Sequence, residues 1–443
     1  MKKILNTFLP LYTTTLLMLL GSGLLTTYIS LRLAGEQVSG TLIGAITAAN
    51  YLGLVIGGKV GHNLIARVGH IRAYVACAGI ITASVVGHGL SSAIPLWIFL
   101  RLIIGLCMMC QYMVLESWLN DRAESSQRGT IFGFYMVATY LGLCGGQVIL
   151  VLTAGLDVSM LLIVALCFSL CLVPIALTTR TTAQPMSPAP MGLGYFMTAI
   201  PKLLAVVLVM GMAVGAFYGL APVYASSQGL TTSQTGIYMG ISIFAGMVSQ
   251  FPLSWLSDRY DRQRLLFFTA VLLALTSLPL SLLPHLAFNW ILVMTFIASM
   301  ALFSLYPLGV AIANDVVAPE RRVSLTASLL MAFGVGASIG PLVTGAAMQP
   351  FGGNVLYLFF SLCGSLIALI VWIRKRQPEI VVDAPLPHVV MPDSLATSPL
   401  AAALNPTLDE EAIQEMMVDT PVLNDNAESE VNEQQAETNG REQ

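Results

Sequence analysis

Two charged side chains lie inside a single apolar stretch, residues 94–118, and are the first candidates for chemistry. Arg101 is the only basic residue deep within an apolar stretch, and Glu116 is the only interior acid away from an expected helix end. Burying a guanidinium is costly unless it is paired or reaches water. Arg101 could therefore recognise a carboxylate or phosphate or take part in coupling, or it could bind backbone carbonyls near residues 13–15 or 21–23.

Glu116 follows Arg101 by fifteen residues, about 22 Å along a helix, so these two side chains cannot pair directly. A carboxyl group in a low dielectric suits reversible protonation. Basic residues are expected close to it, however, in the loop from Arg67 to Arg72 and at Arg128. The sequence thus favours an ion pair that opens and closes with a gate over a role in proton carriage.

The sequence lacks the patterns of a membrane enzyme, namely HExxH, paired intramembrane carboxylates, a Ser–His pair and a nucleotide-binding loop. The missing GKT or GKS motif also excludes an ATP-driven pump in this chain. Cys107 and Cys110 form a CxxC without a second CxxC or a nearby histidine, which favours packing over a metal site. We expect no enzyme activity, no metal, no cofactor and no nucleic-acid partner.

The elements that must hold these residues are membrane-spanning helices. Hydrophobic residues make up 56% of the chain and charged residues 10%, against about a quarter charged in soluble domains. About 20 apolar residues cross a bilayer as a helix. Twelve such stretches are predicted, at residues 9–33, 39–61, 70–90, 94–118, 129–153, 158–178, 200–225, 234–256, 265–284, 289–313, 323–348 and 354–373. The expected fold class is all-α integral membrane.

Lysine and arginine set the expected orientation. With the N-terminus in the cytoplasm, seventeen of them fall at cytoplasmic loops and helix ends, and Arg32 alone on the other side. Both termini are then cytoplasmic in a multi-pass protein of the cytoplasmic (inner) membrane, with the lipid bilayer as its surroundings. Residues 377–443 hold fourteen acidic residues and one basic residue, which predicts a disordered acidic tail.

The two halves of the chain repeat each other in parallel. Three features recur at one offset of 194 residues: Asn120-Asp121 with Asn314-Asp315, Arg128 with Arg322, and Gly142-x3-Gly146 with Gly336-x3-Gly340. Small residues four apart let helices approach closely, so a packing role is expected for these glycines. The predicted domains are an N-terminal bundle (1–178), a cytoplasmic linker (179–199), a C-terminal bundle (200–376) and the tail (377–443).

Several motifs resemble those of the major facilitator superfamily. Residues 254–262, SWLSDRYDR, resemble its cytoplasmic signature G-x-L-A-D-R-x-G-R-K, and residues 62–70, HNLIARVGH, form a more degenerate copy with Ala66 at the acid position. Arg101-x3-Gly105 is similar to its R-x-x-x-G signature, and Gly340-Pro341 resembles a motif often seen in antiporters. The YcaD-like branch is suggested by ESWL at 116–119, RG at 128–129, GQ at 146–147 and YGLAP at 218–222.

The resemblance implies two pseudo-symmetric six-helix bundles around a central cavity. It also implies that the signature residues Arg67, Gly69, Asp258, Arg259 and Arg262 stabilise one conformation of a cytoplasmic gate, although a purely topogenic basic loop would look the same. Candidate cavity residues are Gln111, Tyr112, Tyr218 and Tyr306, with Tyr28, Asn50, Tyr140, Gln147, Phe217 and Gln250. Rings beside amides suit a mostly neutral or amphipathic solute.

The function expected from this resemblance is secondary active transport of a small organic solute by alternating access in a monomer, with protons as a candidate coupling ion. A multidrug-type exporter is one alternative: Pro341 with its glycines favours it, and the missing acid in span one opposes it. Spans one and seven both lack acids, which argues against proton coupling of the usual antiporter kind. A transporter-derived membrane sensor is an alternative from another class, for which the acidic tail is the only hint.

Overall fold

The computed structural model describes residues 2–122, 128–153, 155–177, 193–283, 286–317 and 321–374. All of them belong to one compact unit, residues 1–407; a second unit, 408–443, lies outside the described residues, as does all of the expected tail. The expected linker is described only from residue 193. The boundaries predicted at residues 178, 200 and 376 stay predictions.

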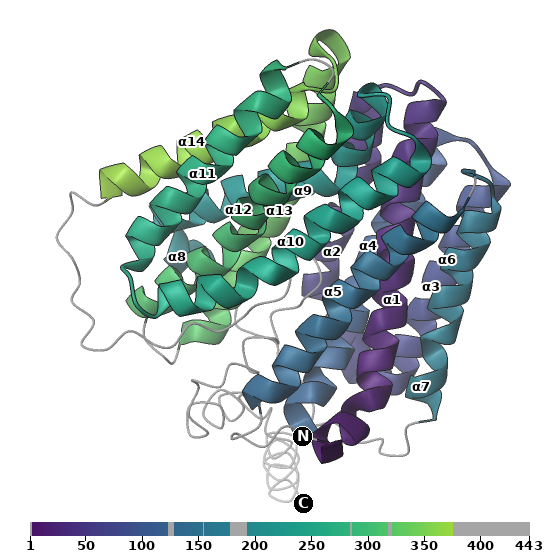
Figure 1. The fold of residues 1–443 in the computed structure, drawn as a ribbon. Coiled ribbons are helices and arrows are strands. Elements are labelled where there is room, and N and C mark those ends of the chain that lie inside the picture. Colours follow the sequence, from purple (N-terminus) through teal and green to yellow (C-terminus); the bar gives the residue numbers. More distant parts are fainter. Residues whose placement is uncertain are drawn as a thin grey trace, which may run out of the picture. The chain divides into compact units, whose positions relative to one another are not determined.

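Across the described ranges the chain forms fourteen α-helices (Figure 1). In the first half these are α1 (Lys2–Gly35), α2 (Gly40–Val68), α3 (His70–Leu90), α4 (Ile94–Arg122), α5 (Arg128–Leu152), α6 (Ser159–Leu170) and α7 (Leu172–Ala176). In the second half they are α8 (Leu193–Ala199), α9 (Pro201–Ser227), α10 (Thr232–Ser257), α11 (Arg262–Leu282), α12 (Phe288–Val316), α13 (Arg322–Phe351) and α14 (Val355–Arg374).

Twelve spans long and apolar enough to cross a membrane lie within the described residues, which confirms the predicted all-α integral membrane fold. Helices α6 and α7 together make one of them, Ser159–Ala176, while α8 has only seven residues and falls inside the expected linker. The spans begin and end within a few residues of the predicted stretches, except that α2 continues to Val68. The signature copy at 62–70 is therefore helical up to Gly69.

Short connections between spans depend on a few local signals. Gly69 has a φ of 85°, a left-handed conformation that an L side chain rarely adopts, and it separates α2 from α3. Thr231 and Gln234 form a reciprocal capping box at the start of α10, and Asp261 accepts from the Arg264 backbone at the start of α11. These caps satisfy backbone donors at the ends of the helices, where the next helix begins.

The helices form two bundles built in the same way (Figure 1). In the first bundle α1 packs on α5, α2 on α4 and α3 on α6; in the second, the corresponding pairs are α9 on α13, α10 on α12 and α11 on α14. Each pair in one bundle has its repeat-related counterpart in the other. The two pseudo-symmetric six-helix bundles that the resemblance implied are therefore present.

The repeated glycines lie where the first and fifth spans of each bundle approach. A Cβ atom at Gly142 would lie 2.6 Å from the Leu16 carbonyl oxygen, and one at Gly146 would lie 2.7 Å from that of Leu20. In the second bundle Gly336 and Gly340 face the carbonyl oxygens of Leu208 and Met212 in the same way. Any side chain at these positions would push the first and fifth spans of the bundle apart.

Candidate functional site

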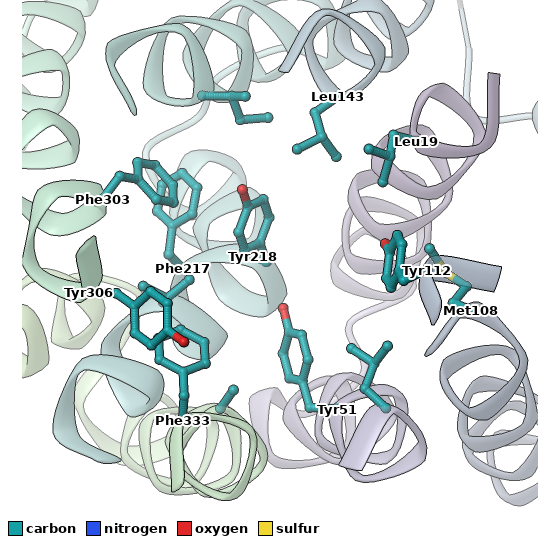
Figure 2. Close-up of a cluster of buried hydrophobic side chains, with 14 of the residues drawn as sticks. Leu19, Tyr51, Met108, Tyr112, Leu143, Phe217, Tyr218, Phe303, Tyr306 and Phe333 are labelled. Atoms are coloured by element: carbon teal, nitrogen blue, oxygen red, sulfur yellow. The ribbon is translucent and has the colours of Figure 1, made fainter. Parts of the chain in front are cut away.

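A cavity of about 50 Å³ lies where the two bundles meet. Four spans of the first bundle contribute Leu19, Ser22, Gly23, Thr26 and Thr27 (α1), Asn50, Tyr51 and Leu54 (α2), Met108 and Tyr112 (α4), and Leu143 and Gln147 (α5), while Tyr218 comes from α9 of the second bundle. A buried water needs roughly 10–15 Å³, so a space of this volume corresponds to a few waters. Figure 2 shows Tyr51, Tyr112 and Tyr218 around this space.

The candidate cavity residues divide into two groups. Tyr112, Tyr218, Asn50 and Gln147 line the cavity. Tyr28, Gln111, Tyr140, Phe217, Gln250 and Tyr306 do not line it but are buried. Figure 2 places Phe217, Phe303, Tyr306 and Phe333 beside the cavity in the second bundle, where the Tyr306 and Phe333 rings meet edge to face at 4.8 Å.

Several lining residues were not predicted. Tyr51, Thr26, Ser22 and Met108 face the cavity from α1, α2 and α4. These spans are hydrophobic on every side, so their sequences carry no period that separates a cavity face from a packing face. Tyr51 could have been found from its neighbour Asn50, since adjacent polar and aromatic residues interrupt an otherwise apolar span.

Arg101 lies immediately behind the cavity wall. Its side chain is 2% exposed, and its Nη2 donates to the Thr26 hydroxyl oxygen at 3.0 Å, which in turn donates to the Ser22 carbonyl at 2.9 Å. The acceptor is thus a side chain of α1, and not the backbone of residues 13–15 or 21–23. Its Nε is buried without a hydrogen-bond partner among the described residues.

Glu116 is completely buried on α4 and accepts a hydrogen bond from the Tyr135 hydroxyl of α5 at 3.2 Å. The side chain of Arg128, its expected basic neighbour, lies outside the described residues. Arg67 is exposed at the end of α2. Glu116 and Arg101 therefore have different partners, Tyr135 on α5 and Thr26 on α1, and do not pair, as the spacing of fifteen residues requires.

The signature residues of the second bundle form a charged cluster at the ends of three helices. Arg262 donates from Nη1 to Asp315 at 2.6 Å, and its Nη2 lies 3.8 Å from Asp258. Arg259 stacks over the Trp255 ring, with 4.1 Å between its Cζ and the ring centroid. Arg262, and not Arg259, is thus the basic partner that links α10, α11 and α12.

The matching place in the first bundle is built differently. His70 occupies the position that corresponds to Arg262, given the offset of 192 residues between the signature loops. Its Nε2 and the Ser117 hydroxyl form a hydrogen bond at 3.2 Å, and its ring stacks on Trp118 at 6.5 Å. Gly69 is exposed and supplies the turn before it. Both bundles therefore link these two helices by side chains, through a hydrogen bond of His70 with Ser117 in the first and an ion pair of Arg262 with Asp315 in the second.

The bundles contact each other closely at the end of the spans that holds Gly40 and Gly345. A Cβ atom at Gly40 would lie 2.8 Å from the Gly345 carbonyl oxygen, and one at Gly44 would overlap the Pro341 carbonyl. Thr41 donates to the Gln349 amide oxygen across the same contact at 3.5 Å. At this end of the spans, backbone of α2 therefore lies directly against backbone of α13.

Twelve spans in two matching bundles, with a polar and aromatic cavity between them, define a membrane transporter. The chain belongs to the Major Facilitator Superfamily, whose family profile matches residues 11–308 and 287–420. It is a secondary transporter of that superfamily and not an enzyme, and it binds a transported substrate.

Among curated relatives, the chain is similar to the uncharacterized MFS-type transporter YcaD of Escherichia fergusonii, with 27% identity over 376 residues, 84% of this chain and 96% of that protein. YcaD of Salmonella enteritidis is also 27% identical, over 81% of this chain and 93% of its own length. This similarity agrees with the predicted branch.

Solved structures share the fold at low sequence identity. The nucleoside transporter NupG matches with a TM-score of 0.72 and 16% identity, over 84% of this chain and 99% of that chain. The xylose transporter XylE from E. coli, in an inward open conformation, matches with a TM-score of 0.66 and 15% identity, over 86% of this chain and 98% of that chain. At this level of identity the likeness concerns the fold alone.

Proposed function

We propose that this protein moves a small organic solute across the cytoplasmic membrane by alternating access between its two bundles, acting as a monomer. The observation that carries the proposal is the cavity where the bundles meet, closed at one end by contacts between α2 and α13. Alternating access requires the two bundles to move relative to each other, so that the cavity opens to one side of the membrane at a time.

The distribution of lysine and arginine supports a cytoplasmic N-terminus and C-terminus. In that orientation the end with Gly40 and Gly345 faces outward, and the conformation described here is closed to the outside. The cluster of Asp258, Arg262 and Asp315 then lies at the cytoplasmic side. We assign this cluster, with Arg67 and Gly69 in the first bundle, to the cytoplasmic gate.

The interior acids favour a gating role for Glu116 over coupling to protons. Glu116 is the interior acid of the first bundle, and its contact with Tyr135 suits a structural or gating role at the end of α4. Spans one and seven contain no acid. The lack of acids in these spans also argues against a multidrug-type exporter that takes up cations at the cavity. A membrane sensor would have the same cavity but would show no flux of the ligand.

A reversible cross-link across the closed end tests the proposal. Thr41→Cys together with Gln349→Cys places two thiols where a hydroxyl and an amide oxygen now lie 3.5 Å apart, in different bundles. A thermal-shift screen first identifies a ligand of the purified protein, and counterflow in proteoliposomes then measures its transport. Oxidation should stop counterflow, and reduction should restore it.

Each single cysteine variant is the control, because it cannot close the cross-link within one chain. Counterflow that continues in the fully cross-linked double variant would exclude alternating access at this contact. A ligand that binds but never shows counterflow, even in the native protein, would favour a sensor.

A further inference from the structure

Among the described residues, Arg101 has few hydrogen-bond partners for its buried positive charge. A guanidinium has five N–H donors. Of these, one has an assigned acceptor, the Thr26 hydroxyl, and Nε is buried with none. Among the described residues no carboxylate lies within ion-pairing distance of Arg101. A purely structural arginine at this depth would be expected to satisfy more of its donors.

The place of this charge relates it to the cavity. Thr26 both lines the cavity and accepts the hydrogen bond from Arg101. Tyr51 lines the same cavity from α2. A ligand group that displaced or joined the Thr26 hydroxyl would therefore reach Arg101 directly.

The cavity wall itself carries no opposite charge. Its thirteen lining residues include hydroxyls, two amides and apolar side chains, but no acid and no base. Glu116 is remote on the same helix, and Asp315 is paired with Arg262. The local field at the cavity is therefore positive, and a low-dielectric surrounding strengthens it.

The rest of the wall suits an organic body. Tyr51, Tyr112 and Tyr218 present rings and hydroxyl groups, while Leu19, Met108 and Leu143 present apolar surface (Figure 2). Leu54 adds a further apolar side chain to the lining. One guanidinium balances one negative charge, whereas a phosphate monoester would bring close to two. A carboxylate also matches the fork of N–H donors in arginine.

We propose that the transported solute is a small organic monoanion whose carboxylate binds at Arg101 and whose apolar or aromatic body lies among Tyr51, Tyr112 and Tyr218. This assignment rests on the proposed transport function and names the substrate class of the same cavity. Thr26 positions the guanidinium in the absence of the solute.

The charge preference of the cavity can be measured without knowing the solute. Ser22→Cys places a thiol on the cavity wall, and the native protein with its seven cysteines gives the background rate. The probes are two methanethiosulfonates of similar size, one with a sulfonate and one with a trimethylammonium group. Each rate on purified protein is divided by that reagent's rate with a free thiol. We expect the anionic reagent to be favoured by about tenfold.

Three arginine variants separate the effect of Arg101 from a general effect of charge. Arg101→Gln should abolish the preference, Arg101→Lys should keep most of it, and Arg32→Gln should leave it unchanged, because Arg32 pairs with Glu36 at the end of α1 away from the lining. A preference for the cationic reagent in the Ser22→Cys protein would overturn the proposal even if Arg101→Gln does not fold. An anionic preference that survives Arg101→Gln would also overturn it.

Failure of this inference can be told apart from failure of the transport function. The reagent ratio reports the charge of the cavity whether or not the protein transports anything. If counterflow stops on cross-linking but the cavity shows no anionic preference, the transport function stands and the monoanion as its substrate is wrong. If the cavity prefers the anionic reagent but the protein shows no counterflow, the anion site stands and the transport function is wrong.

Discussion

The charge state of Glu116 decides between a gate residue and a proton carrier. Tyr135→Phe removes the hydroxyl that donates to this buried carboxylate. A hydrogen bond to a charged group contributes about 1.5–3 kcal/mol and one to a neutral group about 0.5–1.5 kcal/mol. If Glu116 is ionised in the resting protein, Tyr135→Phe should lower the free energy of unfolding in detergent by the larger amount.

Tyr12→Phe is the matched control, because the Tyr12 hydroxyl donates to the neutral Ile131 carbonyl at 3.1 Å in the same bundle. In a Glu116→Gln background the cost of Tyr135→Phe should fall to that of Tyr12→Phe, since the acceptor is then neutral. Equal costs of the two tyrosine substitutions in the native background would mean that the carboxyl group is already neutral, which would return proton carriage to consideration.

At the scale of the helix, the tight glycine contacts between α1 and α5 hold the cavity wall in place. Gly146→Ala would bring a methyl group to 2.7 Å from the Leu20 carbonyl oxygen and the Leu24 nitrogen. Overpacking of this kind costs about 1–3 kcal/mol. We expect a lower thermal unfolding midpoint for the purified protein, because backbone cannot yield as a flexible side chain does.

Gly133→Ala, on the same helix, has no atom within 4 Å of the added methyl group. There alanine should be neutral or should stabilise the helix by about 0.5–1 kcal/mol. Comparable losses at Gly133 and Gly146 would show that close approach to α1 is not what limits residue size.

The sequence predicted elements better than side-chain partners. Helix lengths and the offset of 194 residues predict the twelve spans and the equivalence of the two halves, because a bilayer requires continuous apolar helices and a repeat requires equivalent packing. The contact of Arg101 with Thr26 depends instead on how two helices are rotated about their axes, which near-uniform hydrophobicity leaves undetermined. The pairing of Arg262 with Asp315, 53 residues apart, is hidden for the same reason.

For the whole molecule, the central claim is that opening at one end accompanies closing at the other. Gly44 allows α2 to reach the Pro341 carbonyl of α13, so a tryptophan at this position should hold apart the end that we propose faces outward. Gly58 lies on the same helix with no atom within 4 Å of an added Cβ, so Gly58→Trp is the control.

The most direct measurement is the rate at which a membrane-impermeant thiol reagent modifies Ser22→Cys from each side of sealed, oriented vesicles. With Gly44→Trp we predict a rise of about tenfold or more in the rate from the outer side. The rate from the cytoplasmic side should fall at the same time, and Gly58→Trp should change neither rate. Rates that rise from both sides together, or that do not respond to Gly44→Trp, would contradict alternating access.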